Sequence, residues 1–203
     1  MEYKIARGFS VLLHPLLIPV YLLTYLLFFR FYLILSLPAG FKWTLLALVG
    51  FTTLLMPLLF TWIFQRLRLI SSVSRLGREE RVFPLLAVAV FYYITFYLLK
   101  GIHFSAIFSF YMLDLTILAI LTLIISFYRK ISIYLIAIGS ITGLFAGFSV
   151  KYGVNLNPEI LVSVFAAGLA GFARLAATDH KPSEIYWGYA LGATVTALLA
   201  NLV

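Results

Sequence analysis

Apolar residues recur along this chain in seven runs, each close to the length of a membrane-crossing helix. A helix needs about 20 residues to cross the hydrocarbon core of a bilayer, and the runs lie at roughly 9–29, 43–64, 83–100, 104–128, 131–150, 157–174 and 184–203. The 203 residues are 64% hydrophobic and only 11% charged, which leaves too few polar side chains to cover a water-soluble fold. The sequence therefore predicts an all-α, polytopic transmembrane helix bundle with six to seven spans.

The first apolar run contains prolines and a histidine. It begins near Phe9 and continues past His14-Pro15 and Pro19 without a small-residue cleavage site, so we expect a span rather than a signal peptide. The prolines predict a kink or an interruption in this span. The chain has no cysteine, which excludes a disulfide framework, a thiolate metal site and a cysteine nucleophile. We expect one integral membrane domain over residues 1–203.

Glycines recur every four residues in the fifth and seventh runs, at Gly139, Gly143 and Gly147 and at Gly188 and Gly192. Small residues at this spacing let the backbones of two membrane helices approach closely. We therefore expect these two helices to pack closely and to lie inside the bundle.

Basic residues gather on one side of the predicted topology. Seven crossings place the N-terminus, loop 65–82, the turn at 128–130 and loop 175–183 together, and this side carries 11 of the 15 Lys and Arg residues. The positive-inside rule would make it cytoplasmic. The orientation stays open, because six of these 11 cations are candidates for binding an anion. Without them, 5 basic residues remain on this side and 4 lie on the opposite side. With a net charge of +8, the expected partner is anionic lipid or phosphate, and no nucleic acid is expected.

The polar stretch R-L-A-A-T-D-H-K-P-S-E, residues 174–184, interrupts the apolar sequence. Pro182 is typical of the first turn of a helix, which places Glu184 in that turn, where its carboxylate can fix the tautomer of His180 and leave the other ring nitrogen free. Arg174 offers a planar fork that matches phosphate oxygens. The competing interpretation is structural: Arg174 and Lys181 extend to the interface, and Glu184 is an ordinary acid at a helix N-terminus.

The spacing of Arg174, His180 and Glu184 resembles the third signature of the type-2 phosphatidic acid phosphatase and haloperoxidase superfamily. That signature reads Ser-Arg, five residues, His, three residues, Asp; here Ala173 replaces the Ser and Glu184 replaces the Asp. The resemblance is to a compact bacterial membrane branch. It covers residues 65–203 as a phosphatase-like core, preceded by two N-terminal spans in residues 1–64.

The family's first signature, Lys, six residues, Arg-Pro, has a partial match in the loop that ends R-L-G-R-E-E-R-V-F-P-L. Arg81 corresponds to the Arg, with Pro84 displaced beyond it. Ser74 stands where the Lys is expected, and Arg75 or Arg78 is the candidate to replace that cation.

The family's second signature, Pro-Ser-Gly-His, is not preserved, since the matching region K-I-S-I-Y-L-I-A-I-G-S-I-T-G contains no histidine. In the family this histidine protonates the leaving alkoxide. Tyr134 lies near its expected position, and a phenol with a pKa near 10 is a poor substitute acid. Lys130 is a second candidate, acting by charge. Loss of a general acid typically lowers a rate by about 10²–10⁴-fold.

The resemblance implies a phosphoric monoester hydrolase that acts on a lipid phosphate or diphosphate in the bacterial cytoplasmic (inner) membrane. His180 would attack phosphorus and form a phospho-histidine that water hydrolyses, with Glu184 as its orienting partner. The implied phosphate-binding residues are Arg174, Arg81, Arg78, Arg75 and Lys130. The resemblance implies no cofactor and no metal, although some soluble relatives bind vanadate. The expected partners are the lipid headgroup and the bilayer, with a homo-oligomer also possible.

Two polar residues within the spans have open roles. His14 lies about five residues inside the first span, or roughly 8 Å at about 1.5 Å per residue; it either hydrogen-bonds a neighbouring helix or supplies the missing proton. Asp114 lies in the middle of a span, where a carboxylate indicates a paired or functional group. Two alternatives to a phosphatase also remain: a relative that binds phospholipid headgroups without turnover (as a sensor, scaffold or scramblase), and a small membrane transporter, which Asp114 and the broken first span favour.

Overall fold

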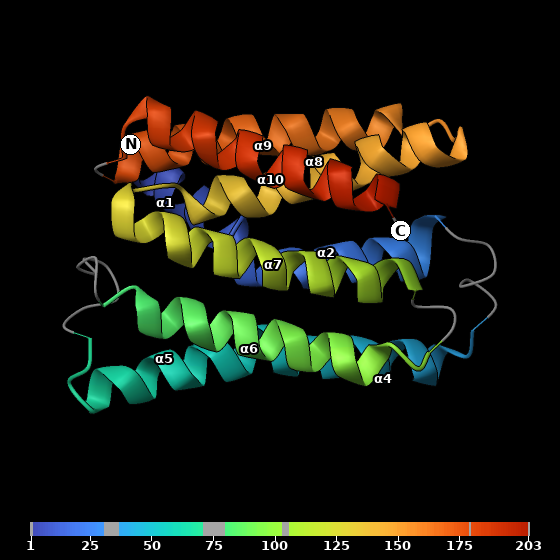
Figure 1. Cartoon of the computed structure of the whole chain (residues 1–203), viewed down its shortest axis with the longest axis horizontal. Helices are drawn as coiled ribbons and strands as arrows, with labels where there is room; N and C mark the ends of the chain where they lie inside the picture. The colour runs from blue at the N-terminus through green and yellow to red at the C-terminus, as the bar shows by residue number, and fades with distance from the viewer. Residues whose placement is uncertain (1, 31–36, 71–79, 103–105, 179, 203) are drawn as a thin grey trace. The chain divides into compact units, whose positions relative to one another are not determined.

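Helices account for the regular structure in the part of the chain that the structure describes (Figure 1). The computed structural model describes residues 2–30, 37–70, 80–102, 106–178 and 180–202. Within these ranges, seven helical segments are long and apolar enough to cross a bilayer: Gly8–Phe29, Ala39–Arg66, Val82–Leu99, Ala106–Tyr128, Ile133–Tyr152, Asn157–Ala177 and Pro182–Leu202. They lie within a few residues of the seven predicted runs. The chain is an all-α, integral multi-pass membrane protein, as its apolar runs predicted.

The helices form two compact units. The terminal unit comprises residues 1–18 and 130–203, and the middle unit comprises residues 19–129. The terminal unit contains α1 (Glu2–Leu12), the single turn η1 (Pro15–Leu17), α8 (Ile133–Tyr152), α9 (Asn157–Ala177) and α10 (Pro182–Leu202). The helix α2 (Ile18–Tyr25) begins at the boundary, and the middle unit continues with η2 (Leu26–Arg30), α4 (Ala39–Gly50), η3 (Phe51–Leu55), α5 (Met56–Arg66), α6 (Val82–Leu99) and α7 (Ala106–Tyr128). These bounds differ from the division at residues 64 and 65, because the resemblance groups residues by motif and the units group them by contact.

The first span is interrupted at His14, as its prolines predicted. The last regular bond of this stretch joins the Leu13 amide to the Phe9 carbonyl, at 2.9 Å. His14 is extended, with φ −63° and ψ 133°, because a residue that precedes proline avoids the helical region. The Nδ1 atom of His14 then accepts a hydrogen bond from the Leu16 amide, at 3.3 Å, and caps the short turn that starts at Pro15.

The glycines of α8 and α10 allow these helices to meet backbone to backbone. A Cβ atom added to Gly139 or Gly143 would collide with the α10 backbone, and one added to Gly192 would collide with the Ile136 carbonyl of α8. The predicted close packing is confirmed. The expectation that both helices lie inside the bundle holds only for α8, where 67% of an apolar 18-residue stretch is buried against 28% of the corresponding stretch of α10. The difference arises because α10 buries its glycine face and exposes Tyr186 and Trp187.

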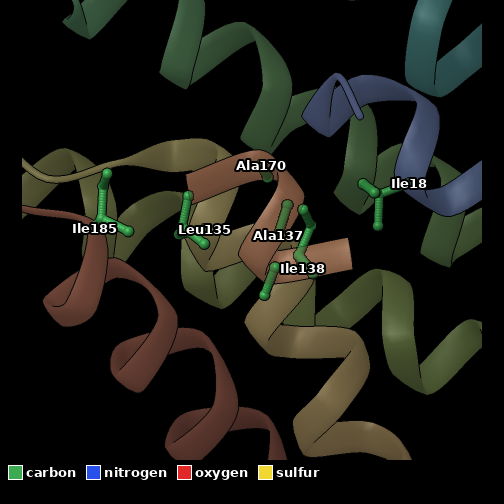
Figure 2. Packing of buried hydrophobic residues seen from close by; sticks show 7 residues of the cluster. Ile18, Leu135, Ala137, Ile138, Ala170 and Ile185 are labelled. Atoms are coloured by element: carbon green, nitrogen blue, oxygen red, sulfur yellow. The ribbon is translucent and has the colours of Figure 1, made fainter. Parts of the chain in front are cut away.

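An apolar cluster in the terminal unit joins the first segment to the last three helices. Figure 2 shows Ile18 of α2, Leu135, Ala137 and Ile138 of α8, Ala170 of α9 and Ile185 of α10 within this cluster, which also includes Ala167. The side chains of Leu13 and Tyr134 pack against it. Because Leu13 precedes His14 and Ile185 follows Glu184, the cluster fixes the elements that carry the polar residues described below.

Buried hydroxyl groups link helices inside each unit. In the terminal unit, Thr142 of α8 donates a hydrogen bond to Ser163 of α9, at 2.9 Å. In the middle unit, Thr95 of α6 donates to Thr52 of η3, at 2.8 Å. Such bonds satisfy polar groups that lipid cannot solvate. Asp114 of α7 is completely buried in the middle unit, and its role stays a prediction.

Four cations at or near the span ends lie over aromatic rings, as is typical of side chains that extend toward a membrane interface. The cation lies 4.0–5.7 Å from the ring centroid in the pairs Lys42–Phe28, Arg66–Trp62, Lys100–Tyr97 and Lys151–Tyr152.

Candidate functional site

A hydrogen-bonded pair, His180 and Glu184, stands at the N-terminus of α10. Nδ1 of His180 lies 2.6 Å from Oε2 of Glu184, and the two side chains are 9% and 13% exposed. The geometry follows from local sequence: Pro182 begins the helix, and the Glu184 amide bonds the Lys181 carbonyl at 3.0 Å, so the fourth residue after His180 turns back toward the ring. The predicted pairing of these residues is present in the structure.

This pairing assigns different roles to the two nitrogens of the His180 ring. A carboxylate only accepts hydrogen bonds, so the neutral imidazole carries its proton on Nδ1 and presents a lone pair on Nε2. Among the residues that the structure describes, Nε2 of His180 has no hydrogen-bond partner. An oriented imidazole with a free Nε2 has the arrangement of a nucleophile or a general base.

The surroundings of His180 favour its neutral form. Burial is the largest effect and lowers the pKa of the imidazole below its ordinary value of 6.5, and the positive charges of Arg174 and Lys130 lower it further. The hydrogen bond and charge of Glu184 act in the opposite direction without reversing the shift. The ring is therefore uncharged at neutral pH, and Nε2 keeps its lone pair.

The start of α8 contacts the first turn of α10 around Glu184. Nζ of Lys130 lies 3.9 Å from Oε2 of Glu184, and the Ser132 amide donates to the Glu184 carbonyl at 3.2 Å. Gly188 makes this approach possible, because a Cβ atom there would lie 2.7 Å from the Ser132 carbonyl oxygen. The carboxylate of Glu184 thus lies between a cation and the imidazole of His180.

Arg174 approaches the same region from the end of α9. Its guanidinium carbon lies 4.4 Å from the centroid of the Tyr134 ring. Its Nε atom is buried and has no hydrogen-bond partner among the described residues. A buried polar group without a partner carries a desolvation penalty and calls for an explanation; a bound anion would supply one, because a guanidinium pairs with phosphate through several N–H groups.

His14 reaches this group from the break in the first span. Its ring centroid lies 5.5 Å from that of Tyr134, and the planes meet at 78°. The terminal unit therefore brings together all six predicted site residues that belong to it, in two groups: Lys130, Glu184 and His180, and His14, Tyr134 and Arg174. The positive charge of Arg174 also acts on the first group, because it lowers the pKa of His180.

The other three predicted site residues are Arg81, Arg75 and Arg78, and their roles stay predictions. Arg81 belongs to the middle unit and directly precedes α6, where its carbonyl accepts from the Leu85 amide at 3.3 Å. Arg75 and Arg78 lie outside the described residues. In the described part of the chain, no three His, Asp or Glu side chains are grouped closely enough to hold a metal ion.

Sequence reasoning gave no role to Ser132, which lies directly beside the cluster. Its side chain is fully buried, and Oγ has no hydrogen-bond partner among the described residues. A serine before an apolar run usually predicts a helix cap, but this side chain makes no capping bond. The backbone hydrogen bond to Glu184 identifies Ser132 as a neighbour of the site. No sequence pattern predicts that contact.

Comparison of the chain with models of protein families, with curated proteins and with solved structures finds no match.

Proposed function

We propose that the protein hydrolyses the phosphate ester of a membrane lipid, with His180 as the nucleophile. The observation that carries this proposal is the 2.6 Å contact between Nδ1 of His180 and Glu184, which leaves a neutral, oriented Nε2 beside two cations. A histidine kept neutral and oriented by a carboxylate is suited to nucleophilic catalysis.

The reaction has two steps in this proposal. Arg174 and Lys130 bind the phosphoryl oxygens and stabilise the charge that they carry in the transition state. The Nε2 lone pair of His180 forms a bond to phosphorus as the ester P–O bond breaks, and the lipid leaves as an alcohol after taking a proton from water or from the Lys130 ammonium. Glu184 stabilises the positive charge that develops on the ring. Water then attacks phosphorus, the P–N bond breaks and its electron pair returns to Nε2, the proton that the water loses restores the proton donor of the first step, and inorganic phosphate leaves.

The substrate class follows from the location of the cluster. His180 lies between two membrane-spanning helices, α9 and α10, so a lipid whose tails stay in the bilayer can bring its headgroup to the span ends. A monoester phosphate or a diphosphate offers exposed oxygens that share two or more negative charges, which suits binding by Arg174 and Lys130. The proposed role in lipid metabolism and the proposed location in a bacterial cytoplasmic membrane rest on the family resemblance. Roles for Arg81, Arg75 and Arg78 rest on that resemblance alone.

The test is phosphate release from phosphatidic acid by the purified full chain in mixed micelles, with glycerol phosphate as a soluble comparison substrate. We expect release from the lipid and its loss in His180→Ala. The matched control is Thr194→Ala, also in the terminal unit, because Thr194 is exposed on α10 and bonds only its own helix. Equal release by His180→Ala and the parent protein would contradict the proposal.

A second candidate is headgroup binding without turnover. It is favoured by the absence of a histidine from residues 130–143 and by the position of Tyr134, whose ring face is covered by the Arg174 guanidinium. This candidate predicts that the parent protein binds phosphatidic acid vesicles in preference to phosphatidylcholine vesicles and releases no phosphate. Release that depends on His180 would exclude it.

A further inference from the structure

The two ring nitrogens of His14 differ in their contacts: the fold gives Nδ1 a hydrogen bond and gives Nε2 none among the described residues. Nδ1 caps the turn that starts at Pro15 by accepting from the Leu16 amide, at 3.3 Å. Ser, Thr, Asp and Asn are the usual residues for such a cap, and they do it without an imidazole ring. The structure describes no hydrogen-bond partner for Nε2 of His14. A half-buried ionisable residue within a membrane span is a functional candidate when its surroundings provide a ligand site.

The cap also determines which protons the ring carries. Because Nδ1 accepts a hydrogen bond from a backbone amide, the ring is neutral and carries its single proton on Nε2. An imidazolium would direct a second N–H at the Leu16 amide, so this geometry favours a hydrogen-bond donor over a proton donor. A neutral donor of this kind polarises or binds an oxygen atom without changing its own charge.

The rings of His14 and Tyr134 are in contact, and Arg174 of the proposed site lies over the same Tyr134 ring. His14 meets Tyr134 at a centroid distance of 5.5 Å, and Arg174 lies over the same Tyr134 ring at 4.4 Å. The neighbouring Leu13 and Tyr134 pack against the apolar cluster, which fixes the segment that carries His14 relative to α8. Three separate segments thus meet around Tyr134, and two of them present N–H donors that lack a described acceptor.

We propose that His14 is a further binding residue of this site, whose neutral Nε2–H donates a hydrogen bond to a phosphoryl oxygen of the substrate. The inference rests on the proposed function and adds to it a residue that the third signature does not contain. It also explains why a histidine, rather than an ordinary capping residue, stands at the break in the first span.

Two substitutions separate the capping nitrogen from the binding nitrogen. His14→Asn keeps an acceptor near the position of Nδ1, because Asn is a favoured cap, and removes the Nε2 donor. His14→Gln places an amide N–H near the position of Nε2 and weakens the cap. We expect His14→Asn to lower kcat/KM for phosphatidic acid by roughly 10–100-fold at unchanged thermal stability, and His14→Gln to recover part of that loss.

Two further measurements distinguish this role from a structural one. Inorganic phosphate should bind to His14→Asn about tenfold or more weakly than to the parent protein in isothermal titration. The ratio of kcat/KM between parent and His14→Asn should stay constant from about pH 6.5 to about pH 8.5, because a neutral donor does not titrate there; the groups described as facing His14 are Tyr134 of α8 and Arg174 of α9.

The outcomes separate the two proposals. Hydrolysis that is lost in His180→Ala but unchanged in His14→Asn, with unchanged phosphate binding, overturns the role of His14 alone. A parent protein that neither hydrolyses phosphatidic acid nor binds phosphate overturns the proposed function and this inference with it. If the ratio of kcat/KM between parent and His14→Asn falls with rising pH, His14 acts as a titrating acid, and its role as a neutral donor is overturned.

Discussion

The guanidinium of Arg174 lies over the face of the Tyr134 ring, with its carbon 4.4 Å from the ring centroid. An aromatic face attracts a cation without occupying its N–H groups, so Arg174 is held in place while its donors stay available. This arrangement differs from an ion pair, in which a carboxylate would compete with a phosphate for the same donors.

Arg174→Lys is expected to weaken phosphate recognition even though it conserves the charge. An ammonium lacks the planar fork and stacks less well on an aromatic ring, so we expect kcat/KM to fall by roughly 10–100-fold, mainly through KM. The control is Arg66→Lys, which makes the same exchange at an arginine that lies over the Trp62 ring. A loss in Arg66→Lys as large as in Arg174→Lys would show that the exchange acts through cation–aromatic packing in general and not through phosphate recognition.

Tyr134→Phe tests whether the phenol supplies a proton. The ring alone supports Arg174 and contacts His14, so a supporting role predicts a change in kcat of less than about threefold, whereas loss of a general acid predicts about 10²–10⁴-fold. We expect the small effect, together with a much larger loss in Tyr134→Ala. Single-turnover rates of phosphate release would measure this difference.

Activity should decline at acidic pH because His180 must be neutral to attack. Burial first, and then the charges of Arg174 and Lys130, lower the pKa of His180 below 6.5, so the decline should occur below that pH. Since the unfolded chain binds this proton more readily than the folded chain, stability should also fall as pH drops from 6.5 through the folded pKa. Removing the Lys130 charge should move the acid limb of kcat/KM to higher pH, and Glu184→Gln should move it to lower pH.

Gly188→Ala should separate α10 from the start of α8. The added Cβ would lie 2.7 Å from the Ser132 carbonyl oxygen, so α10 must move away from the start of α8, and the contacts of Ser132 and Lys130 with Glu184 should weaken. We expect a loss of about 1–3 kcal/mol of stability and most of the activity. Gly168→Ala is the matched control, since a Cβ atom there meets nothing within 4 Å. Thermal unfolding of both variants in the same detergent would compare them, and equal effects would contradict the packing argument.

Much of the fold was predictable because membrane helices need long apolar runs and close pairs need small residues. The break at His14 followed from Pro15, and the close packing of α8 and of α10 followed from the glycine spacing, but that spacing did not show that the two helices pack against each other. The exposure of α10 was not predictable in this way, because glycines at every fourth position describe one face of a helix and say nothing about its other side.

The pairing of His180 with Glu184 was also predictable, since Pro182 begins a helix and an acid in the first turn can reach back to the residue that precedes it. The positions of Arg174 over Tyr134 and of Ser132 beside Glu184 were not, because they depend on how three helices meet in space. A cation near the end of a span has the same sequence signature whether it lies over a ring at the end of its helix, as Lys151 does, or joins a cluster of polar residues from other helices, as Arg174 does. Only the packing around it separates these cases.

The central claim is that His180 accepts a phosphoryl group, and detection of the phosphorylated residue during turnover tests it most directly. Protein quenched in alkali while it hydrolyses phosphatidic acid should carry an acid-labile phosphoryl group on the peptide that contains His180, identified by mass spectrometry, and His180→Ala should carry none. Phosphate release by the parent protein without modification of His180, or undiminished release by His180→Ala, would contradict the account.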